Sequence, residues 1–283
     1  MLILQDMKTW RFWRHFLVAS FACLGVFSTI LQTSNVINPT VTLFQGMPIL
    51  VFVIVSSIIA GLISSWPRPI AQHYSSPNTR ISIVSGDILV QATHLVIGTT
   101  DSFDTETPNI IAKASLQGQA LEKLYGGDLK DLDTQLTAAL DGKTVVGNIA
   151  KSGKQDQYAI GTVVTLKHAA RLIFFLAYCE MDEKNNASST PDKVWKSLLS
   201  LWDEVSTKGN GGTVSIPVIG GGLARLSNLV PAQDAIRFTL LSFMFASRGG
   251  KICDELRIVV SPADYRRLDR LELQSFLDSL RSS

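Results

Sequence analysis

Four short groups of glycine and polar residues each follow an apolar segment, and their residue types are those that bind ligands. Glycine runs let backbone N–H groups approach an anion, and hydroxyl and carboxyl side chains hydrogen bond to sugars and bases. The groups are residues 86–88 (GDI), 98–104 (GTTDSFD), 220–222 (GGG) and 261–265 (SPADY). Ligands of α/β proteins bind at the carboxyl ends of strands, so we predict one binding cleft built from all four groups.

The same groups bear on catalysis and on metal binding. The glycine run 220–222 lies between a predicted strand and a helix start, a pattern that favours phosphate binding and also fits a tight turn. Asp101 and Asp104 are of a type that activates water, but no partner base or nucleophile is recognisable beside them. The three cysteines form no CxxC or Cys/His pattern, so we expect no metal site.

Segments of strand and helix character alternate after residue 80. Strands are predicted at residues 81–87, 94–100, 144–150, 158–166, 171–181, 213–219 and 255–260, with 144–150 and 158–166 as a pair. Helices are predicted at residues 109–125, 128–140, 191–209, 232–250 and 265–283. This alternation predicts an α/β fold, a three-layer α/β/α sandwich with a mixed central sheet.

The N-terminal part of the chain contains one long uncharged run. Residues 15–67 include no Asp, Glu, Lys or Arg, in a chain of which 18% is charged. This run holds two apolar stretches, residues 16–31 and 47–66. With residues 13–15 as the interfacial start of the first, the spans cover about residues 13–32 and 47–66, and both are long enough to cross a membrane. A cleaved signal peptide has one apolar core, and a soluble helix has a polar face, so these alternatives fit less well. We predict a two-helix transmembrane hairpin over residues 1–66.

Basic residues at the two ends of the hairpin set its expected orientation. Lys8, Arg11 and Arg14 precede the first span and Arg68 follows the second, whereas the connecting loop has no Lys or Arg. By the positive-inside rule, both termini of this two-pass protein are expected in the cytoplasm.

The rest of the organisation follows from composition. Gly25 and Gly61 are small enough to permit close contact between the two spans. Residues 67–79 are rich in Pro and Ser and predict a semi-rigid linker, which leaves residues 80–283 as one cytoplasmic domain. A net charge of +2 with 46% hydrophobic residues excludes a disordered chain and disfavours a nucleic-acid binder.

Two of the motifs resemble those of the macro domain, a binder of ADP-ribose. A strand enters residues 84–88 (VSGDI) as in the family's Gly-Asp-Ile/Leu motif, and residues 217–222 (PVIGGG) follow its P-x-x-G-x-G form. The segment FDT…SLQGQ…LYGGD and the two preceding spans are similar to a narrower group, the membrane-anchored macro-domain effectors of bacterial Thoeris anti-phage defence. The resemblance covers about residues 80–283 and implies a macro-domain-like fold.

The resemblance also implies a role for each matching position. Asp87 would accept a hydrogen bond from the adenine amino group, near the backbone N–H of Ile88. Residues 220–222 would surround the diphosphate with backbone N–H groups, and residues 99–104 would surround the distal ribose. Tyr265 would stack on the base.

The implied ligand-binding set is larger, and three of its members have a structural alternative. A helix-cap aspartate at Asp87, a solvated Arg225 and a core tyrosine at Tyr265 stay open as interpretations. The implied set is Gly86, Asp87, Ile88, Thr99, Thr100, Asp101, Ser102, Phe103, Asp104, Gly220, Gly221, Gly222, Leu223, Ala224, Arg225, Ser261, Asp264 and Tyr265.

The chain departs from the hydrolytic members of the family in one loop. Hydrolytic macro domains carry an asparagine-rich loop with a glycine run after the second strand, and residues 98–105 (GTTDSFDT) have neither. We therefore expect binding without turnover, no catalytic residue and no cofactor.

The narrower resemblance implies a bacterial defence effector. Its ligand would be an ADP-ribose derivative that a TIR-domain enzyme makes from NAD, with histidine–ADP-ribose as the expected conjugate. Binding would drive homo-oligomerisation in the bacterial inner membrane, disrupt membrane lipid and abort infection, with no nucleic acid as a partner. Two alternatives stay open, a membrane-tethered hydrolase of ADP-ribose derivatives and a passive membrane anchor with a vestigial cleft.

Overall fold

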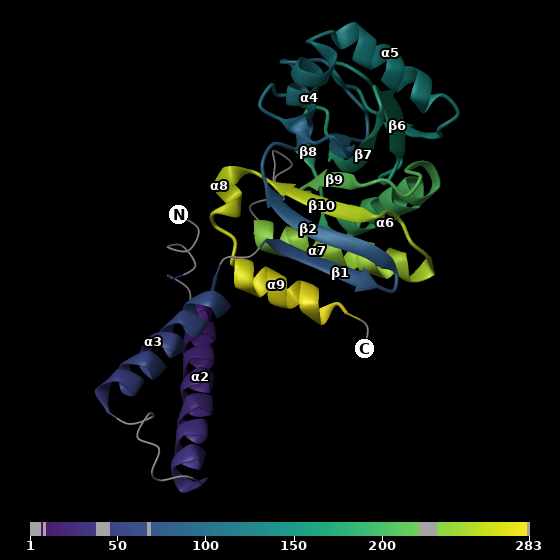
Figure 1. Ribbon diagram of the computed structural model, residues 1–283. Helices are drawn as coiled ribbons and strands as arrows, with labels where there is room; N and C mark the ends of the chain where they lie inside the picture. Colours follow the sequence, from purple (N-terminus) through teal and green to yellow (C-terminus); the bar gives the residue numbers. More distant parts are fainter. Residues whose placement is uncertain (1–6, 8–9, 38–45, 67–68, 221–230, 282–283) are drawn as a thin grey trace. The chain divides into compact units, whose positions relative to one another are not determined.

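The chain is made of two compact units. The computed structural model describes residues 7, 10–37, 46–66, 69–220 and 231–281. One unit consists of residues 1–68 with 269–272, and the other of residues 69–268 with 273–283. The first unit contains the two apolar helices, and the second contains an α/β sheet (Figure 1).

Two helices, α2 (Trp10–Ile37) and α3 (Met47–Ser64), form where the uncharged run predicts them. By length and composition each of them is apolar enough to cross a membrane. α2 extends beyond the predicted span of residues 13–32 at both ends, whereas α3 ends at Ser64, two residues before the predicted end of the second span.

The two helices approach each other closely at Gly61. A Cβ atom at Gly61 would collide with the Ser20 hydroxyl of α2, whereas one at Gly25 would meet nothing within 4 Å. Phe27 of α2 and Phe52 of α3 add an edge-to-face contact with ring centroids 5.8 Å apart. Of the two glycines expected to permit close contact, Gly61 does so within this hairpin and Gly25 does not.

The second unit is built on a mixed sheet with strand order β1-β2-β10-β9-β3-β7-β6, to which β8 adds beside β7. The five central strands β2, β10, β9, β3 and β7 are parallel, and β1, β6 and β8 are antiparallel to their neighbours. The strands are β1 (Ile70–Ser75), β2 (Asn78–Ser85), β3 (His94–Thr100), β6 (Val163–His168), β7 (Arg171–Met181), β8 (Ala187–Ser188), β9 (Val214–Pro217) and β10 (Glu255–Val260). A separate two-stranded sheet joins β4 (Val145–Asn148) to β5 (Asp156–Tyr158).

Helices cover both faces of the sheet and give the predicted three layers (Figure 1). One face carries η2 (Ile88–Val90), α4 (Leu116–Tyr125) and α5 (Leu129–Leu140). The other carries α6 (Pro191–Lys208), α7 (Ala232–Ala246) and residues 273–279 of α9 (Arg270–Ser279). Two short helices, η4 (Ser247–Gly249) and α8 (Pro262–Tyr265), complete the unit.

Alternate residues of the central strands face two separate hydrophobic cores. On β7, Phe174 and Leu176 belong to the core on the α6–α7 side, whereas Ile173 and Phe175 belong to the core on the α4–α5 side. All four side chains are fully buried. The uninterrupted apolar sequence of β7 is thus explained by burial on both faces of the sheet.

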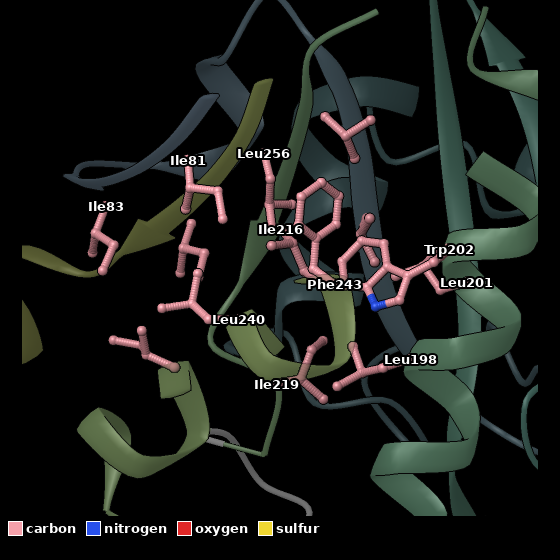
Figure 2. Packing of buried hydrophobic residues seen from close by; sticks show 14 of the residues in the cluster. Ile81, Ile83, Leu198, Leu201, Trp202, Ile216, Ile219, Leu240, Phe243 and Leu256 are labelled. Atoms are coloured by element: carbon pink, nitrogen blue, oxygen red, sulfur yellow. The ribbon is translucent and has the colours of Figure 1, made fainter. Parts of the chain in front are cut away.

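The larger of the two cores contains Trp202 of α6. Its indole packs edge-to-face on Phe243 of α7 with ring centroids 5.2 Å apart, and its Nε1 donates to the Ser242 hydroxyl at 3.0 Å. Figure 2 shows the two rings among aliphatic side chains of the sheet and of both helices. This packing fixes α6 and α7 on the sheet.

Residues 70–79, which we expected in the linker, instead form β1 and the start of β2. Ile70 and Tyr74 of β1 are buried, and the Tyr74 hydroxyl donates to the backbone carbonyl of Leu277 at 2.7 Å. Pro77 lies in the turn between the strands, where its missing N–H removes no ladder hydrogen bond. The linker prediction is therefore wrong for residues 70–79, because Pro69 and Pro77 flank an edge strand, β1.

Two further elements differ from the sequence prediction. α4 begins at Leu116 and not at residue 109, because the Ser115 hydroxyl caps it by accepting the Gly118 N–H at 3.1 Å. β4 pairs with residues 156–158, and residues 163–168 join β7 in the main sheet. Strand pairing depends on contacts distant in sequence, which apolar runs alone do not specify.

Gly61→Leu is expected to push α2 and α3 apart, because the added side chain would fill space that α2 occupies. The measurement is excimer emission from pyrene on the Phe27→Cys and Phe52→Cys positions, in a Cys23→Ser background in detergent micelles. We expect excimer emission to fall severalfold. Gly25→Leu is the matched control and should leave the emission unchanged, and equal loss in both variants would contradict the close contact.

Candidate functional site

The carboxyl ends of the parallel strands lie along one edge of the sheet. β2 and β10 end side by side at Ser85 and Val260, and β10 and β9 are paired up to Val259 and Pro217. The Gly86 N–H donates to the Val260 carbonyl at 3.0 Å, which joins the first predicted group to the strand end that precedes the fourth. The described members of all four groups therefore lie at the same edge, where ligands of α/β proteins bind.

A short ladder between β3 and β9 opens a cavity at this edge. Among the residues that the structure describes, the ladder consists of His94 with Val214 and Leu95 with Ser215. The chain leaves β3 toward α4 on one face and leaves β9 toward α7 on the other, which makes this the topological switch point of the sheet. A cavity of about 430 Å³ lies at this point.

The cavity has a neutral wall. The described lining contains no Asp, Glu, Lys, Arg or His, and offers apolar surface with hydroxyl and amide groups. The described lining residues are Gly98, Thr99, Thr100, Ile110, Ile111, Ala112, Ala114, Ser115, Leu116, Gln117, Tyr178, Cys179, Met181, Asn185, Asn186, Ala187, Pro217, Val218 and Ile219.

A β-bulge at Tyr178 shapes one side of the cavity. The register between β3 and β7 shifts between Thr99 and Thr100, and Tyr178 is the extra residue on β7. Its ring packs against Gly98, where any Cβ atom would collide with it. As a result of the bulge, Tyr178 and the next residue, Cys179, both line the cavity.

Neither of these two side chains is an ionised nucleophile at neutral pH. Burial raises the pKa of the Cys179 thiol to about 12. Burial also raises the pKa of the Tyr178 hydroxyl well above its ordinary value. The reactive form of cysteine is the thiolate, so the cavity offers hydrogen bonds and packing at these positions.

Asp104 forms a buried ion pair in the loop between β3 and α4, residues 101–115, which we call the cavity loop. Its carboxylate contacts the ammonium group of Lys151, and the two side chains are 1% and 0% exposed. Ser102 Oγ donates to Asp104 Oδ2 at 2.8 Å, and the Lys154 N–H donates to Oδ1 at 2.8 Å. With both oxygens occupied, Asp104 anchors the loop between β3 and α4 to the segment after β4.

Asp101 is buried against β7. Its Oδ1 accepts the Met181 N–H at 2.9 Å, and its Oδ2 accepts from Gln157 Nε2 at 3.0 Å. Burial is the main cause that raises the pKa of Asp101 above its ordinary value. Phe103 is also fully buried and contacts Tyr158 with ring centroids 5.7 Å apart.

The structure therefore divides the predicted loop of residues 99–104 in two. Thr99 and Thr100 line the cavity, and the side chains of residues 101–104 face the interior. The expectation that all six residues surround a ligand is therefore wrong for residues 101–104. The carboxylates of Asp101 and Asp104 already accept hydrogen bonds within the protein, and Asp104 also pairs with Lys151. Asp101 and Asp104 are thus structural residues, and neither faces the cavity as a water-activating base.

Gln117 is a cavity residue that the sequence analysis did not single out. Its Oε1 accepts from Thr99 Oγ1 at 3.1 Å, and its Nε2 donates to the Asp104 carbonyl at 2.6 Å. It links the first turn of α4 to the cavity loop. It lies in the SLQGQ segment, but no spacing pattern distinguishes it from the other glutamine there.

Asp87 lies at the predicted edge but outside the 430 Å³ cavity. Its Oδ1 accepts the Leu89 N–H at 2.9 Å and caps η2, and its Oδ2 contacts the Lys123 ammonium group. The hydrogen bond from Lys123 is the main cause that lowers the pKa of Asp87. The Asp87 side chain is 36% exposed, so it is both a helix cap and an accessible carboxylate, whereas Ile88 is buried in the α4–α5 core.

Residues 261–265, the predicted group after β10, are held by the N-terminal cap of α8. Ser261 Oγ accepts the Asp264 N–H at 3.1 Å and donates to Asp264 Oδ2 at 2.8 Å. Tyr265 is 8% exposed and packs in the α6–α7 core, as its core-tyrosine interpretation requires. Ser261 and Asp264 remain at the exposed edge.

The predicted glycine loop begins beside the cavity. Pro217, Val218 and Ile219 line the cavity, and Gly220 follows with φ +86°, a backbone conformation that favours glycine. Five further predicted residues lie outside the described residues, namely Gly221, Gly222, Leu223, Ala224 and Arg225.

The turn after β7 is a second part of the cavity that the sequence analysis missed. Asn185 and Asn186 line the cavity on the side of β7. The predicted strand stops at residue 181, and the following DEKNN sequence has only the composition of an ordinary turn. The described part of the chain holds no group of three or more His, Cys, Asp or Glu residues arranged for a metal ion.

Comparisons with known proteins agree with this fold. The family model described as "Thoeris protein ThsA, Macro domain" matches residues 81–261. A mutant of the Oceanobacillus iheyensis macrodomain has 15% identity and a TM-score of 0.51, covering 76% of this chain and 97% of that chain. A second mutant with ADPR has 16% identity and a TM-score of 0.51, covering 74% and 99%. The same macrodomain with ADP has 15% identity and a TM-score of 0.50, covering 75% and 99%.

At these identities, the likeness to the solved structures concerns the fold alone. No curated protein sequence matches the chain.

Asp101→Asn should change how stability depends on pH. Because burial raises the folded-state pKa of Asp101, its contribution to stability is present at low pH and is lost as pH rises through that pKa. The asparagine variant cannot titrate, so its free energy of unfolding relative to wild type should increase as pH is raised from about 4 upward. The measurement is chemical denaturation of the full chain in detergent micelles at a series of pH values.

Asp87→Asn is the control with the opposite sign. The pKa of Asp87 is lowered, so its contribution is present above the unfolded-state pKa and is lost as pH falls. Relative to wild type, Asp87→Asn should therefore lose stability as pH rises toward about 4, and the difference should stay constant above that pH. The same trend in both variants would contradict the burial of Asp101.

Proposed function

This chain belongs to the family of Thoeris ThsA macro domains, and we propose that its α/β unit binds an ADP-ribose-type nucleotide derived from NAD. The observation that carries the proposal is the cavity at the switch point between β3 and β9, at the carboxyl edge of a macro-type sheet. Support also comes from the solved macrodomain structures of the same fold, one of which was solved with ADPR and one with ADP.

The length of the edge suits an extended dinucleotide-like ligand. β2 and β7 are four strand spacings apart, which is about 19 Å at about 4.8 Å for each spacing. In the proposed pose, the adenine lies near Asp87 at the β2 end. The diphosphate lies near Gly220, which follows β9, and the distal group enters the cavity between β9 and β7.

We propose binding without turnover. The described part of the lining supplies no charged general base or acid, and burial raises the pKa values of Cys179 and Tyr178. Asp101 and Asp104 already hydrogen bond within the protein. A hydrolase would need a group in the cavity that can accept a proton near neutral pH.

The two apolar helices extend the proposal to a membrane effector. In this proposal they anchor the chain as a two-pass protein of the bacterial inner membrane, with both termini in the cytoplasm. The ligand is a signal made by a TIR-domain enzyme, with histidine–ADP-ribose as the leading conjugate. Its binding drives homo-oligomerisation of the hairpins, which disrupts the lipid bilayer and stops the infected cell.

The binding step is tested by calorimetric titration of ADP-ribose into the full chain in detergent micelles. Ala114→Trp should weaken binding at least about tenfold, because Ala114 is an exposed lining residue and an indole there would fill the mouth of the cavity. Lys113→Trp is the matched control, since Lys113 is exposed and outside the described lining, and it should bind like wild type.

Two results would contradict the binding proposal. One is the absence of binding heat for wild type, and the other is equal affinity of the Ala114→Trp and Lys113→Trp variants. Mass spectrometry of the recovered ligand should show it unchanged, and conversion during the incubation would favour the hydrolase.

The effector step is tested with dye-filled vesicles of phosphatidylethanolamine and phosphatidylglycerol that carry the full chain. ADP-ribose and histidine–ADP-ribose, added separately, should increase dye release severalfold for at least one of the two ligands. The Ala114→Trp variant should release dye at the ligand-free rate. Binding without any ligand-dependent release would reject the effector and favour the passive anchor.

A further inference from the structure

The turn between β7 and β8 forms a rigid part of the cavity wall. Asp182 Oδ1 accepts the backbone N–H of Lys184 at 2.9 Å and that of Asn186 at 2.7 Å. The Asn185 N–H donates to the Asp182 carbonyl at 3.0 Å, and the Asp182 N–H donates to the Asn186 carbonyl at 3.1 Å. These bonds fix the backbone of the turn without help from a ligand.

Asn185 is the unusual member of this turn. Its backbone has φ +58°, the left-handed region that asparagine tolerates better than most residues. Asn185 lines the cavity, and its Oδ1 is buried without a hydrogen-bond partner. Buried amide oxygens are nearly always paired, so this unpaired acceptor points to a partner in the ligand, which the oxygen meets when the amide rotates toward the cavity.

The neighbouring polar groups of the lining already have partners within the protein. Thr99 donates to Gln117, and Gln117 also donates to a backbone carbonyl. Ser115 Oγ both donates to a carbonyl and caps α4, and the Asn186 amide donates to Asp182. Among these groups, the Asn185 oxygen alone lacks a partner and can accept a hydrogen bond from a ligand group.

We propose that Asn185 recognises the distal end of the nucleotide by accepting a hydrogen bond from a hydroxyl or amino group. This inference rests on the proposed function, in which the distal group enters the cavity between β9 and β7. An amide oxygen pairs with O–H and N–H donors and repels phosphate oxygens, which are acceptors. The described wall also holds no cation that would attract an anion. The distal group is thus a hydroxyl- or amine-bearing moiety, and a terminal phosphate is disfavoured.

The test compares ADP-ribose with ADP, which lacks the distal ribose, in calorimetric titrations of the full chain in detergent micelles. Asn185→Gly removes the amide and keeps a residue suited to the left-handed backbone. It should raise the Kd for ADP-ribose about five- to tenfold and change the Kd for ADP less than about twofold.

Two further variants separate recognition from structure. Asn185→Asp keeps the acceptor oxygen and should keep the wild-type ratio of the two Kd values, because any repulsion of the diphosphate affects both ligands equally. Lys184→Ala changes an exposed residue of the same turn and should leave both Kd values unchanged.

Each outcome decides the matter. Loss of the ADP-ribose preference in Asn185→Gly, with the preference retained in Asn185→Asp, supports the recognition role. If Asn185→Gly keeps the wild-type ratio of the two Kd values, the recognition role is wrong and the proposed function stands. If Asn185→Gly does not fold, loss of that ratio in Asn185→Asp overturns the recognition role in the same way. If wild type binds neither ligand, the proposed function fails and this inference fails with it.

Discussion

Two residue pairs join β3 to β9, and the shortness of this ladder determines where the molecule has room for a ligand. The constraint is topological, because the chain must leave β3 toward one face of the sheet and β9 toward the other. Among the described residues, the gap between the strands is lined by residues of the cavity loop, of β7 and of the segment 218–219 after β9. The two hydrophobic cores hold these segments at fixed distances, and the opening persists because both helical layers are anchored independently.

Charge is distributed so that the described part of the cavity wall is neutral. Two acidic residues of the cavity loop, Asp101 and Asp104, are used inside the protein, one against β7 and one with Lys151. These bonds give the loop a single conformation and let Thr99 face the cavity. Affinity in such a site depends on shape and on individual hydrogen bonds, because no charged side chain of the described wall can attract a ligand.

The sequence predicts elements well where one physical signal dominates. β7 and α6 have the predicted bounds within a residue, since burial on both faces and a proline start are local signals. β1 was missed because its apolar positions lie among prolines and serines, and only pairing with β2 makes them a strand. At the site, strand ends identify the correct edge, but the direction of each side chain depends on packing. Nothing local distinguishes Thr99 from Asp101, or Asn185 from any other turn asparagine.

The bulge at Tyr178 has a consequence for how this sequence can evolve. The Tyr178 ring occupies the space that a side chain at position 98 would need. A mutation of Gly98 is therefore tolerated only after the ring has become smaller, and a smaller ring leaves a void unless position 98 has gained a side chain. The two positions can therefore change only in that order, position 178 first, through an intermediate in which the space of the Tyr178 ring is empty. Lineages that follow this path would enlarge the cavity for a time, which gives natural selection an opportunity to change the ligand.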